Sequence, residues 1–307
     1  MIVAVTGPTG ELGRAFLRAL QRDGEITRVH GMARRPFDPG DLTKLEYRQG
    51  DVLDAVAVDA LARDADVLVH LAFIILGGRD ETRTVNLTGS RNVFRAARKH
   101  VGRLVYTSSV AAYGFHDDNP QPLTEEVQPR GSERFYYSAQ KAELEAVLHE
   151  EFPDAYVLRP CIVAGPDARM LLRQLPPKPL LLPDPGTPFQ LVHHDDVAQA
   201  LVAAAKGRGA PGAYNLAGDG TITLSDLARA TGRLAFPIPR ILLGPAALAA
   251  DLPLVPTLAQ WVNAGRTPVV MDTAKARREL GWRPRYDTRE TLGALVSAEQ
   301  VERGADD

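Results

Sequence analysis

The chain opens with a short apolar run that leads directly into a glycine-rich turn. Residues 2–6 are β-branched or small, and residues 6–13 space their glycines G-x-x-G-x-x-G ahead of an amphipathic stretch. Small residues let a backbone approach a pyrophosphate, and a helix that begins here offers unpaired N–H groups and a partial positive charge. Because the turn joins a strand to a helix, it predicts a dinucleotide site. The expected contacts are Gly7, Thr9, Gly10, Glu11, Leu12 and Gly13.

The first 165 residues continue this alternation of short apolar runs and longer amphipathic stretches. Strands are predicted over 2–6, 27–33, 45–49, 67–71, 103–107 and 155–159, and helices begin near residues 11, 55, 82 and 133. This pattern is typical of an α/β fold with a doubly wound parallel sheet, the Rossmann fold. The ligand crevice of such a sheet lies at the carboxyl ends of its strands.

The sequence pattern changes after Gly165, where prolines interrupt a segment with little hydrophobic periodicity. A helix is expected again over 195–205, a strand over 213–217, and a helix that Ser225 caps and that runs through Thr231. We therefore expect a dinucleotide-binding domain of residues 1–165 plus about 191–219. Residues of about 166–190 and 220–307 would form a smaller, discontinuous substrate-binding region.

Charge, cysteine content and apolar segments limit the expected binding partners and the expected cellular location. A net charge of −2 offers no broad basic surface for nucleic acid, so the expected partner is a small molecule. The single cysteine, Cys161, fits a reducing compartment, and residues 1–6 form a strand pattern rather than a secretory leader. The apolar segment 241–255 contains glycine, prolines and Asp251, which favours a buried or interface helix over membrane contact. A cytoplasmic location is expected.

Tyr137 and Lys141 form the chemically informative pair. Positions i and i+4 share one face of a helix. The ordinary pKa of tyrosine is about 10, and an ammonium beside the phenol favours the phenolate and lowers that pKa. Tyr137 would then be a general acid/base. An ordinary exposed helix face can show the same spacing, but here the pair follows both the glycine turn and the serines Ser108 and Ser109.

The end of the second strand bears on cofactor choice. Folds that bind NAD usually place an acid there for the ribose 2′-hydroxyl, whereas this chain has Ala33, Arg34 and Arg35. Two guanidinium groups suit a 2′-phosphate and favour NADP over NAD, although a solvated basic turn would look the same. Asp51, after the third strand, could accept a hydrogen bond from the adenine amine or cap a helix.

These ordered motifs resemble the extended short-chain dehydrogenase/reductases, the NAD-dependent epimerase/dehydratase group, over nearly the whole chain. The resemblance is carried by residues 6–13, 50–51, 70–72, 85–89, 105–109, 113–114, 137–141, 158–160, 165–166, 192–198, 214–216, 279–282 and 284. It implies that Ser109 polarises the substrate oxygen, that Tyr137 transfers the proton, and that Lys141 lowers the pKa of Tyr137 and binds the nicotinamide ribose. Ser108 would be a helper or a structural neighbour, and Asn86 structural. Further cofactor contacts implied are Val52, Leu71, Ala72, Phe73, Thr107, Pro160, Ile162 and Val163.

The resemblance leaves several reactions open. Dehydratases of the family carry Asp-Glu after the catalytic Ser or Thr, where this chain has Val110 and Ala111. Nucleotide-sugar epimerases usually carry an arginine where this chain has the neutral Phe189 and Gln190, which we expect to contact substrate. An NADP-dependent carbonyl reductase acting on an apolar or small carbonyl or alcohol is therefore preferred. An epimerase is the alternative, and a cofactor-sensing protein without activity is less favoured.

Other polar residues have plainer explanations. His193, His194, Asp195 and Asp196 could suggest a metal site, but four adjacent residues should not converge on one ion, so no metal is expected. His70 is expected to be a hydrogen-bonded strand end, Trp282 a core residue, and Cys161 not a nucleophile. The family resemblance suggests a homodimer through helices near 82–100 and 133–151.

Overall fold

The computed structural model describes residues 1–75, 77–133, 135–174, 181–237 and 267–306. Its centre is a seven-stranded sheet in the order β10-β6-β5-β4-β1-β2-β3, and every neighbouring pair is parallel. The strands are β1 Ile2–Thr6, β2 Arg28–Ala33, β3 Leu45–Gln49, β4 Val67–His70, β5 Arg103–Thr107, β6 Tyr156–Pro160 and β10 Gly212–Leu216. The predicted Rossmann fold is confirmed.

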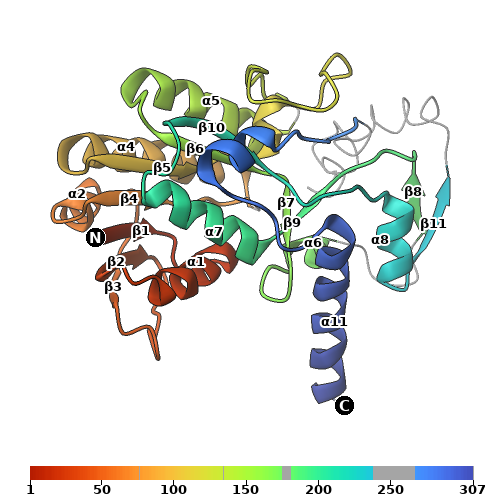
Figure 1. Cartoon of the computed structure of the whole chain (residues 1–307), viewed down its shortest axis with the longest axis horizontal. Coiled ribbons are helices and arrows are strands. Elements are labelled where there is room, and N and C mark those ends of the chain that lie inside the picture. Colours follow the sequence, from red (N-terminus) through yellow and green to blue (C-terminus); the bar gives the residue numbers. More distant parts are fainter. Residues whose placement is uncertain (76, 134, 175–180, 238–266, 307) are drawn as a thin grey trace.

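Helices cover both faces of this sheet (Figure 1). They are α1 Glu11–Arg22, α2 Ala55–Ala62, α3 Arg79–Arg83, α4 Gly89–His100, α5 Tyr136–Glu151 and α7 His194–Ala205. In β1, Val3 and Val5 face the cluster that includes α1 and α7, while Ala4 faces the cluster of α2, α4 and α5. This period-two alternation of apolar residues on both faces is what a doubly covered strand requires.

The remaining elements gather at one end of the sheet, with α8, β8 and β11 grouped beyond it (Figure 1). The short strand β7 Ile162–Ala164 pairs with β9 Leu191–His193, and β8 Leu181–Asp184 pairs with β11 Leu234–Pro237. The helices here are α6 Met170–Gln174, α8 Leu224–Ala230 and α11 Thr288–Asp306. A separate hydrophobic cluster holds them together: Ala164, Leu172, Leu191, Ile222, Leu227, Leu292 and Leu295.

Three expectations need correction. The segment after Gly165, predicted to be rich in loops and to have little periodicity, contains α6 and β8. The helix expected from residue 82 is interrupted by a π-helical turn, η1 Thr84–Thr88, between α3 and α4. Ser225 does not cap α8, because the helix begins one residue earlier and Thr223 forms a capping box with Asp226.

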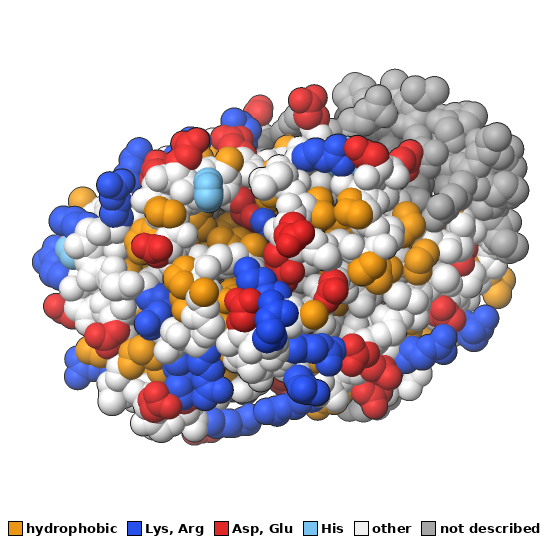
Figure 2. Space-filling model, turned by 45° about the horizontal axis from the view of Figure 1, so that its top comes forward, with side chains coloured by type: hydrophobic (Ala, Val, Ile, Leu, Met, Phe, Trp, Pro, Cys, Tyr) orange, Lys and Arg blue, Asp and Glu red, His pale blue; other side chains and the backbone are white. Residues whose placement is uncertain are grey.

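The apolar segment 241–255 lies outside the described residues, so its predicted helix is not described. Among the residues that are described, no helix is long and apolar enough to cross a membrane. Acidic and basic side chains are interspersed over the face shown in Figure 2.

Candidate active site

The turn between β1 and α1 is shaped by close backbone contacts. Gly7 has φ +74°, and a Cβ there would lie 2.7 Å from the backbone nitrogen of Ala72. A Cβ on Gly13 would overlap the Gly7 carbonyl and Pro8. Gly10 precedes α1 and supplies no side-chain cap, so the N–H groups of the first turn remain available to a phosphate. The turn therefore fits the pyrophosphate of a dinucleotide.

The end of β2 lies beside this turn, because the Gly7 N–H donates to the Met32 carbonyl at 2.9 Å. Arg34 and Arg35 follow with exposed side chains. Their backbone is held against β3: the single O–H of Tyr47 is shared between the carbonyls of Ala33 and Arg35, and Gln49 donates to that of Arg34. Arg34 and Arg35 thus belong to a hydrogen-bonded loop next to the glycine turn.

Asp51 is not the cap of the following helix. Its Oδ1 accepts the Leu53 N–H at 3.0 Å, while Asp54 caps α2 by accepting the N–H groups of Val56 and Ala57. The helix-cap alternative for Asp51 is therefore wrong. Binding of the adenine amine by Asp51 stays a prediction.

The three residues expected to be catalytic lie together where β5 ends. Ser109 caps the 3₁₀ turn η2 Val110–Tyr113 and accepts the Ala111 N–H at 3.2 Å. Its side chain is hydrogen-bonded to Tyr137, which is 7% exposed in the first turn of α5. One turn further along α5, the Lys141 ammonium donates to the Thr107 carbonyl at 2.8 Å and to the Tyr106 hydroxyl at 3.3 Å.

Burial dominates the proton affinity of this pair. It raises the pKa of Tyr137 to about 12, against the opposing hydrogen bond from Ser109. It also lowers the pKa of Lys141 to about 7, against the opposing charge of Glu145. The expected lowering of the Tyr137 pKa is therefore wrong for this structure. The physical reason is that both groups are removed from water, which disfavours each charged form, while the ammonium directs hydrogen bonds to β5.

Phe73 links the phosphate cradle to the catalytic pair. It belongs to the segment 71–73 after β4, whose Ala72 backbone packs directly over Gly7. The Phe73 ring centroid lies 3.7 Å from the Lys141 nitrogen, and the ring meets Tyr137 edge-on at 5.5 Å. Together with Ala111, Phe115, Phe135 and Tyr136 it forms an apolar cluster around the Tyr137 ring. The cradle and the proton-transfer residues are thus neighbours, as a dinucleotide between them would require.

Thr107 at the end of β5 offers a further polar atom. Its Oγ1 is buried and has no hydrogen-bond partner among the described residues. A buried hydroxyl without a partner at the carboxyl end of a central strand fits contact with a ligand. The other expected contacts continue from β6 into β7, where Pro160 ends one strand and Ile162 and Val163 form the next.

Cys161, between these strands, is buried, and burial raises the pKa of its thiol well above the ordinary value. A thiol whose pKa is raised in this way is a poor nucleophile.

Val52 packs against Gly89 at the start of α4, where a Cβ would overlap the valine side chain.

The two residues expected to contact substrate, Phe189 and Gln190, differ in how many hydrogen bonds their side chains make within the protein. The Phe189 N–H pairs with the Ile222 carbonyl at 2.9 Å and its ring packs against the third hydrophobic cluster. Gln190 uses both ends of its amide on the backbone, donating to the Gly218 carbonyl and accepting the Met271 N–H. Substrate contact by Gln190 stays a prediction, with these two hydrogen bonds against it.

His70, Asn86 and Trp282 have structural environments. The His70 ring nitrogens are hydrogen-bonded to Thr6 at 2.6 Å and Ser90 at 2.8 Å, and burial lowers its pKa to about 3. Asn86 makes two hydrogen bonds with the Ile74 backbone and one with Gln140. Trp282 is buried, and its ring N–H donates to the Asp196 carbonyl.

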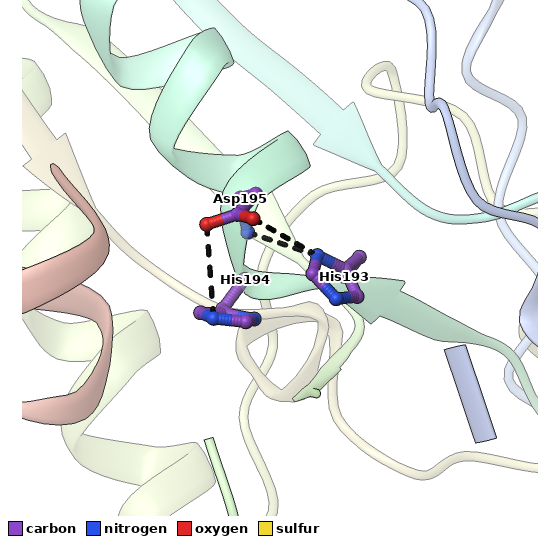
Figure 3. Close-up of side chains that lie close together, drawn as sticks. All are labelled: His193, His194 and Asp195. Carbon is purple, nitrogen blue, oxygen red and sulfur yellow. Dashed lines mark hydrogen bonds and ion pairs between the residues drawn. The ribbon is translucent and has the colours of Figure 1, made fainter. Parts of the chain in front are cut away.

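His193, His194 and Asp195 do converge, contrary to the expectation from their adjacency. One possible ligand atom from each lies within 4.8 Å of the others (Figure 3). The His193 Nδ1 lone pair, however, accepts the Asp195 N–H at 3.2 Å, and the Arg18 guanidinium lies 3.9 Å from the Asp195 carboxylate. An occupied lone pair and a neighbouring cation are poor features of a metal site. The His193 side chain instead caps the start of α7.

Sequence reasoning missed a buried network directly behind the site. The Ser108 hydroxyl donates to Glu145, whose carboxylate also forms an ion pair with Arg159 at 2.5 Å. Arg159 donates to the Tyr113 hydroxyl at 2.8 Å, and Tyr113 in turn donates to Asn215 at 2.7 Å. The available signal was an arginine in the otherwise apolar run of β6, together with an acid one helical turn beyond Lys141.

A glycine cradle beside a Ser-Tyr-Lys constellation defines a dinucleotide-dependent enzyme of the hydride-transferring kind. The sequence profile of the NAD dependent epimerase/dehydratase family matches residues 3–217. The chain belongs to this family, and so to the extended short-chain dehydrogenase/reductases.

Similar proteins extend over most of the chain. A Sinorhizobium fredii protein of uncharacterised activity, y4nG, is 28% identical over 98% of this chain and 79% of its own length. The ceramide reductase of Caulobacter vibrioides is 34% identical over 66% of this chain and 60% of its own length. The structure of UDP-glucuronic acid 4-epimerase from Bacillus cereus with NAD has a TM-score of 0.72, covers 98% of this chain and 99% of its own, and is 18% identical. At that identity the likeness is one of fold.

Proposed function

We propose that the protein is an NADP(H)-dependent carbonyl reductase or alcohol dehydrogenase. The observation that carries the proposal is the Tyr137 phenol, which is hydrogen-bonded to Ser109 and buried in an apolar cluster. With a pKa raised to about 12, this phenol is protonated at neutral pH and can donate a proton to a substrate oxygen. Reduction of a carbonyl needs such a donor.

Three residues have separate roles in the proposed reduction. Ser109 and Tyr137 hold the substrate oxygen between their hydroxyls, and Tyr137 gives up its proton as the alcohol forms. Lys141 stabilises the negative charge that remains on the phenol oxygen. When bound, NADP(H) supplies the hydride. Elimination of a hydroxyl is disfavoured because the buried Val110 and Ala111, which follow Ser109, supply no acid.

The substrate is proposed to be apolar. Aromatic side chains surround the Tyr137 ring, and its cluster neighbours Phe73, Phe115 and Phe135 offer no charge to a sugar diphosphate. The reductase name of the Caulobacter relative supports reduction over epimerisation. Five basic residues could still bind a diphosphate: Arg169, Arg173, Lys178, Arg240 and Arg266. Arg169 donates to the Pro166 carbonyl at 2.6 Å, the side chain of Arg173 is not described, and the other three lie outside the described residues.

NADP preference is proposed from the exposed Arg34 and Arg35 at the end of β2. The double variant Arg34→Ala/Arg35→Ala should lose at least about tenfold in kcat/KM with NADPH, while kcat/KM with NADH changes little. An equal effect on both cofactors would contradict the preference. The NAD named in the Bacillus cereus structure makes this a necessary test.

The central test is turnover. Purified protein with NADPH and a panel of apolar ketones and aldehydes should consume NADPH, and Tyr137→Phe should lower kcat by at least ~100-fold while cofactor affinity is kept. Interconversion of UDP-sugars without net change of NADPH would support the epimerase instead. Cofactor binding with no turnover in either assay would support a sensor.

A homodimer through α4 and α5 is also proposed. The outer side of these helices carries Arg91 and Glu143, which pair at 3.3 Å, and Glu143 also pairs with Arg83 of α3. Such an interface would be polar at its rim. Sedimentation of a monomer at micromolar concentration would refute it.

A further inference from the structure

The buried carboxylate of Glu145 contacts the loop that carries the catalytic serine. Ser108 immediately precedes Ser109, and its hydroxyl donates to Glu145 on α5. Its backbone N–H donates to the Leu158 carbonyl of β6 at 2.8 Å. Both attachments are buried, with Ser108 at 2% and Glu145 at 7% exposure. The Ser109 turn is therefore fastened on one side by α5 and on the other by β6.

Glu145 is itself held in one orientation by Arg159. The Arg159 Nε lies 3.1 Å from each carboxylate oxygen, and Nη2 lies 2.5 Å from Oε2. The other arm of Arg159 donates to Tyr113, whose hydroxyl is anchored to Asn215 of β10. A carboxylate with bidentate support cannot rotate away from Ser108 without breaking several buried hydrogen bonds.

The same carboxylate supplies negative charge near Lys141. The two residues are one helical turn apart on α5 and share its buried face. The titratable or charged groups around the ammonium come from four elements: Tyr137 and Glu145 of α5, Tyr106 of β5, His70 of β4, and Arg159 of β6 behind Glu145. Of these, Glu145 alone is a carboxylate and carries a negative charge at neutral pH.

We propose that Glu145 is a positioning residue of the active site: it fixes the Ser109 turn through Ser108 and favours the ammonium form of Lys141. This proposal rests on the proposed function for its catalytic meaning, but the contacts hold irrespective of substrate. Two separable effects follow. Loss of the Ser108 hydroxyl disturbs geometry alone, whereas loss of the Glu145 charge also changes the protonation of Lys141.

Ser108→Ala tests the geometric part with little risk to folding. It should lower kcat about tenfold, because a small displacement of a reacting group is costly, while the KM for NADPH stays the same. It should leave the pH dependence unchanged, since no charge is removed. Parental kcat in Ser108→Ala would overturn the positioning of Ser109.

Glu145→Gln tests the electrostatic part, with Glu143→Gln as its control. Glu143 lies on the same helix but pairs with Arg83 and Arg91 on the outer side. Titration of ¹³C-labelled lysine by NMR, with Lys141→Arg to assign the signal, should place the Lys141 midpoint about one pH unit lower in Glu145→Gln. Glu143→Gln should not move it. An unmoved midpoint in a folded Glu145→Gln protein would overturn the proposal.

Folding and function are tested separately. If Glu145→Gln unfolds, Glu145→Asp retains the charge and removes the reach to Ser108, so it should keep the parental Lys141 midpoint and lose kcat like Ser108→Ala. A shifted midpoint in Glu145→Asp would contradict the proposal. The NMR titration needs no turnover. If the protein reduces no carbonyl, the proposed function is wrong, and the titration still decides whether Glu145 affects the protonation of Lys141.

Discussion

Ser109 contributes a single hydroxyl, and its replacement isolates that contribution. The side chain is buried at the start of η2 and hydrogen-bonded to Tyr137. Ser109→Ala should reduce kcat/KM for ketone reduction by ~100-fold or more, as when one donor to a developing oxyanion is removed. Ser109→Thr keeps a hydroxyl and should retain activity within ~10-fold of the parent. Steady-state kinetics decide the matter, and an alanine variant above a tenth of parental activity would contradict the role.

Residue identity at the site was predictable where spacing has one structural meaning. Ser109, Tyr137 and Lys141 were expected together because their order follows a strand-turn-helix cradle, and they are neighbours in the structure. The direction in which the pKa of Tyr137 shifts was not predictable, because it depends on how far Phe73 and its aromatic neighbours exclude water. Glu145 was missed for a similar reason. Its importance lies in its partners Ser108 and Arg159, which are far away in the sequence.

At the scale of single elements, the strands were predicted closely and the helix ends less so. β1, β3 and β5 have the predicted bounds. In β1 the β-branched run ends at the glycine-rich turn, which leaves little choice for the end of the strand. The interruption of the helix after residue 82 by η1 has no periodic signal in the sequence. Its Asn86 accepts the Ile74 N–H and donates to Gln140, tertiary contacts that sequence periodicity does not record.

The start of α8 gives an element-scale prediction with an internal control. The Thr223 side chain accepts the Asp226 N–H, and the Asp226 carboxylate accepts the Thr223 N–H at 3.0 Å. Thr223→Ala should lower the free energy of unfolding by about 1 kcal/mol, the usual value of a helix cap. Ser225→Ala on the same helix should change it by less than about 0.5 kcal/mol. Urea denaturation compares them, and equal losses would return the cap to Ser225.

At the scale of the whole molecule, the buried histidine at the centre of the sheet couples stability to pH. His70 lies between Thr6 of β1 and Ser90 of α4, and burial lowers its pKa to about 3 from 6.5 in the unfolded chain. Between these values the unfolded chain binds the proton and the folded chain does not. The contribution of His70 to folding stability is therefore fully present above about pH 6.5 and is lost as the pH drops toward 3.

The slope gives the measurable outcome. One such histidine changes the free energy of unfolding by about 1.4 kcal/mol per pH unit, and His193, whose pKa burial lowers to about 4, acts in the same direction. Urea unfolding at pH 7.5, 6.0 and 5.0 should show this decline. His70→Gln can still form hydrogen bonds but cannot take up a proton, so it should be less stable at pH 7.5 and yet lose less on acidification. A parental slope in His70→Gln would show that the proton taken up on unfolding belongs to another group.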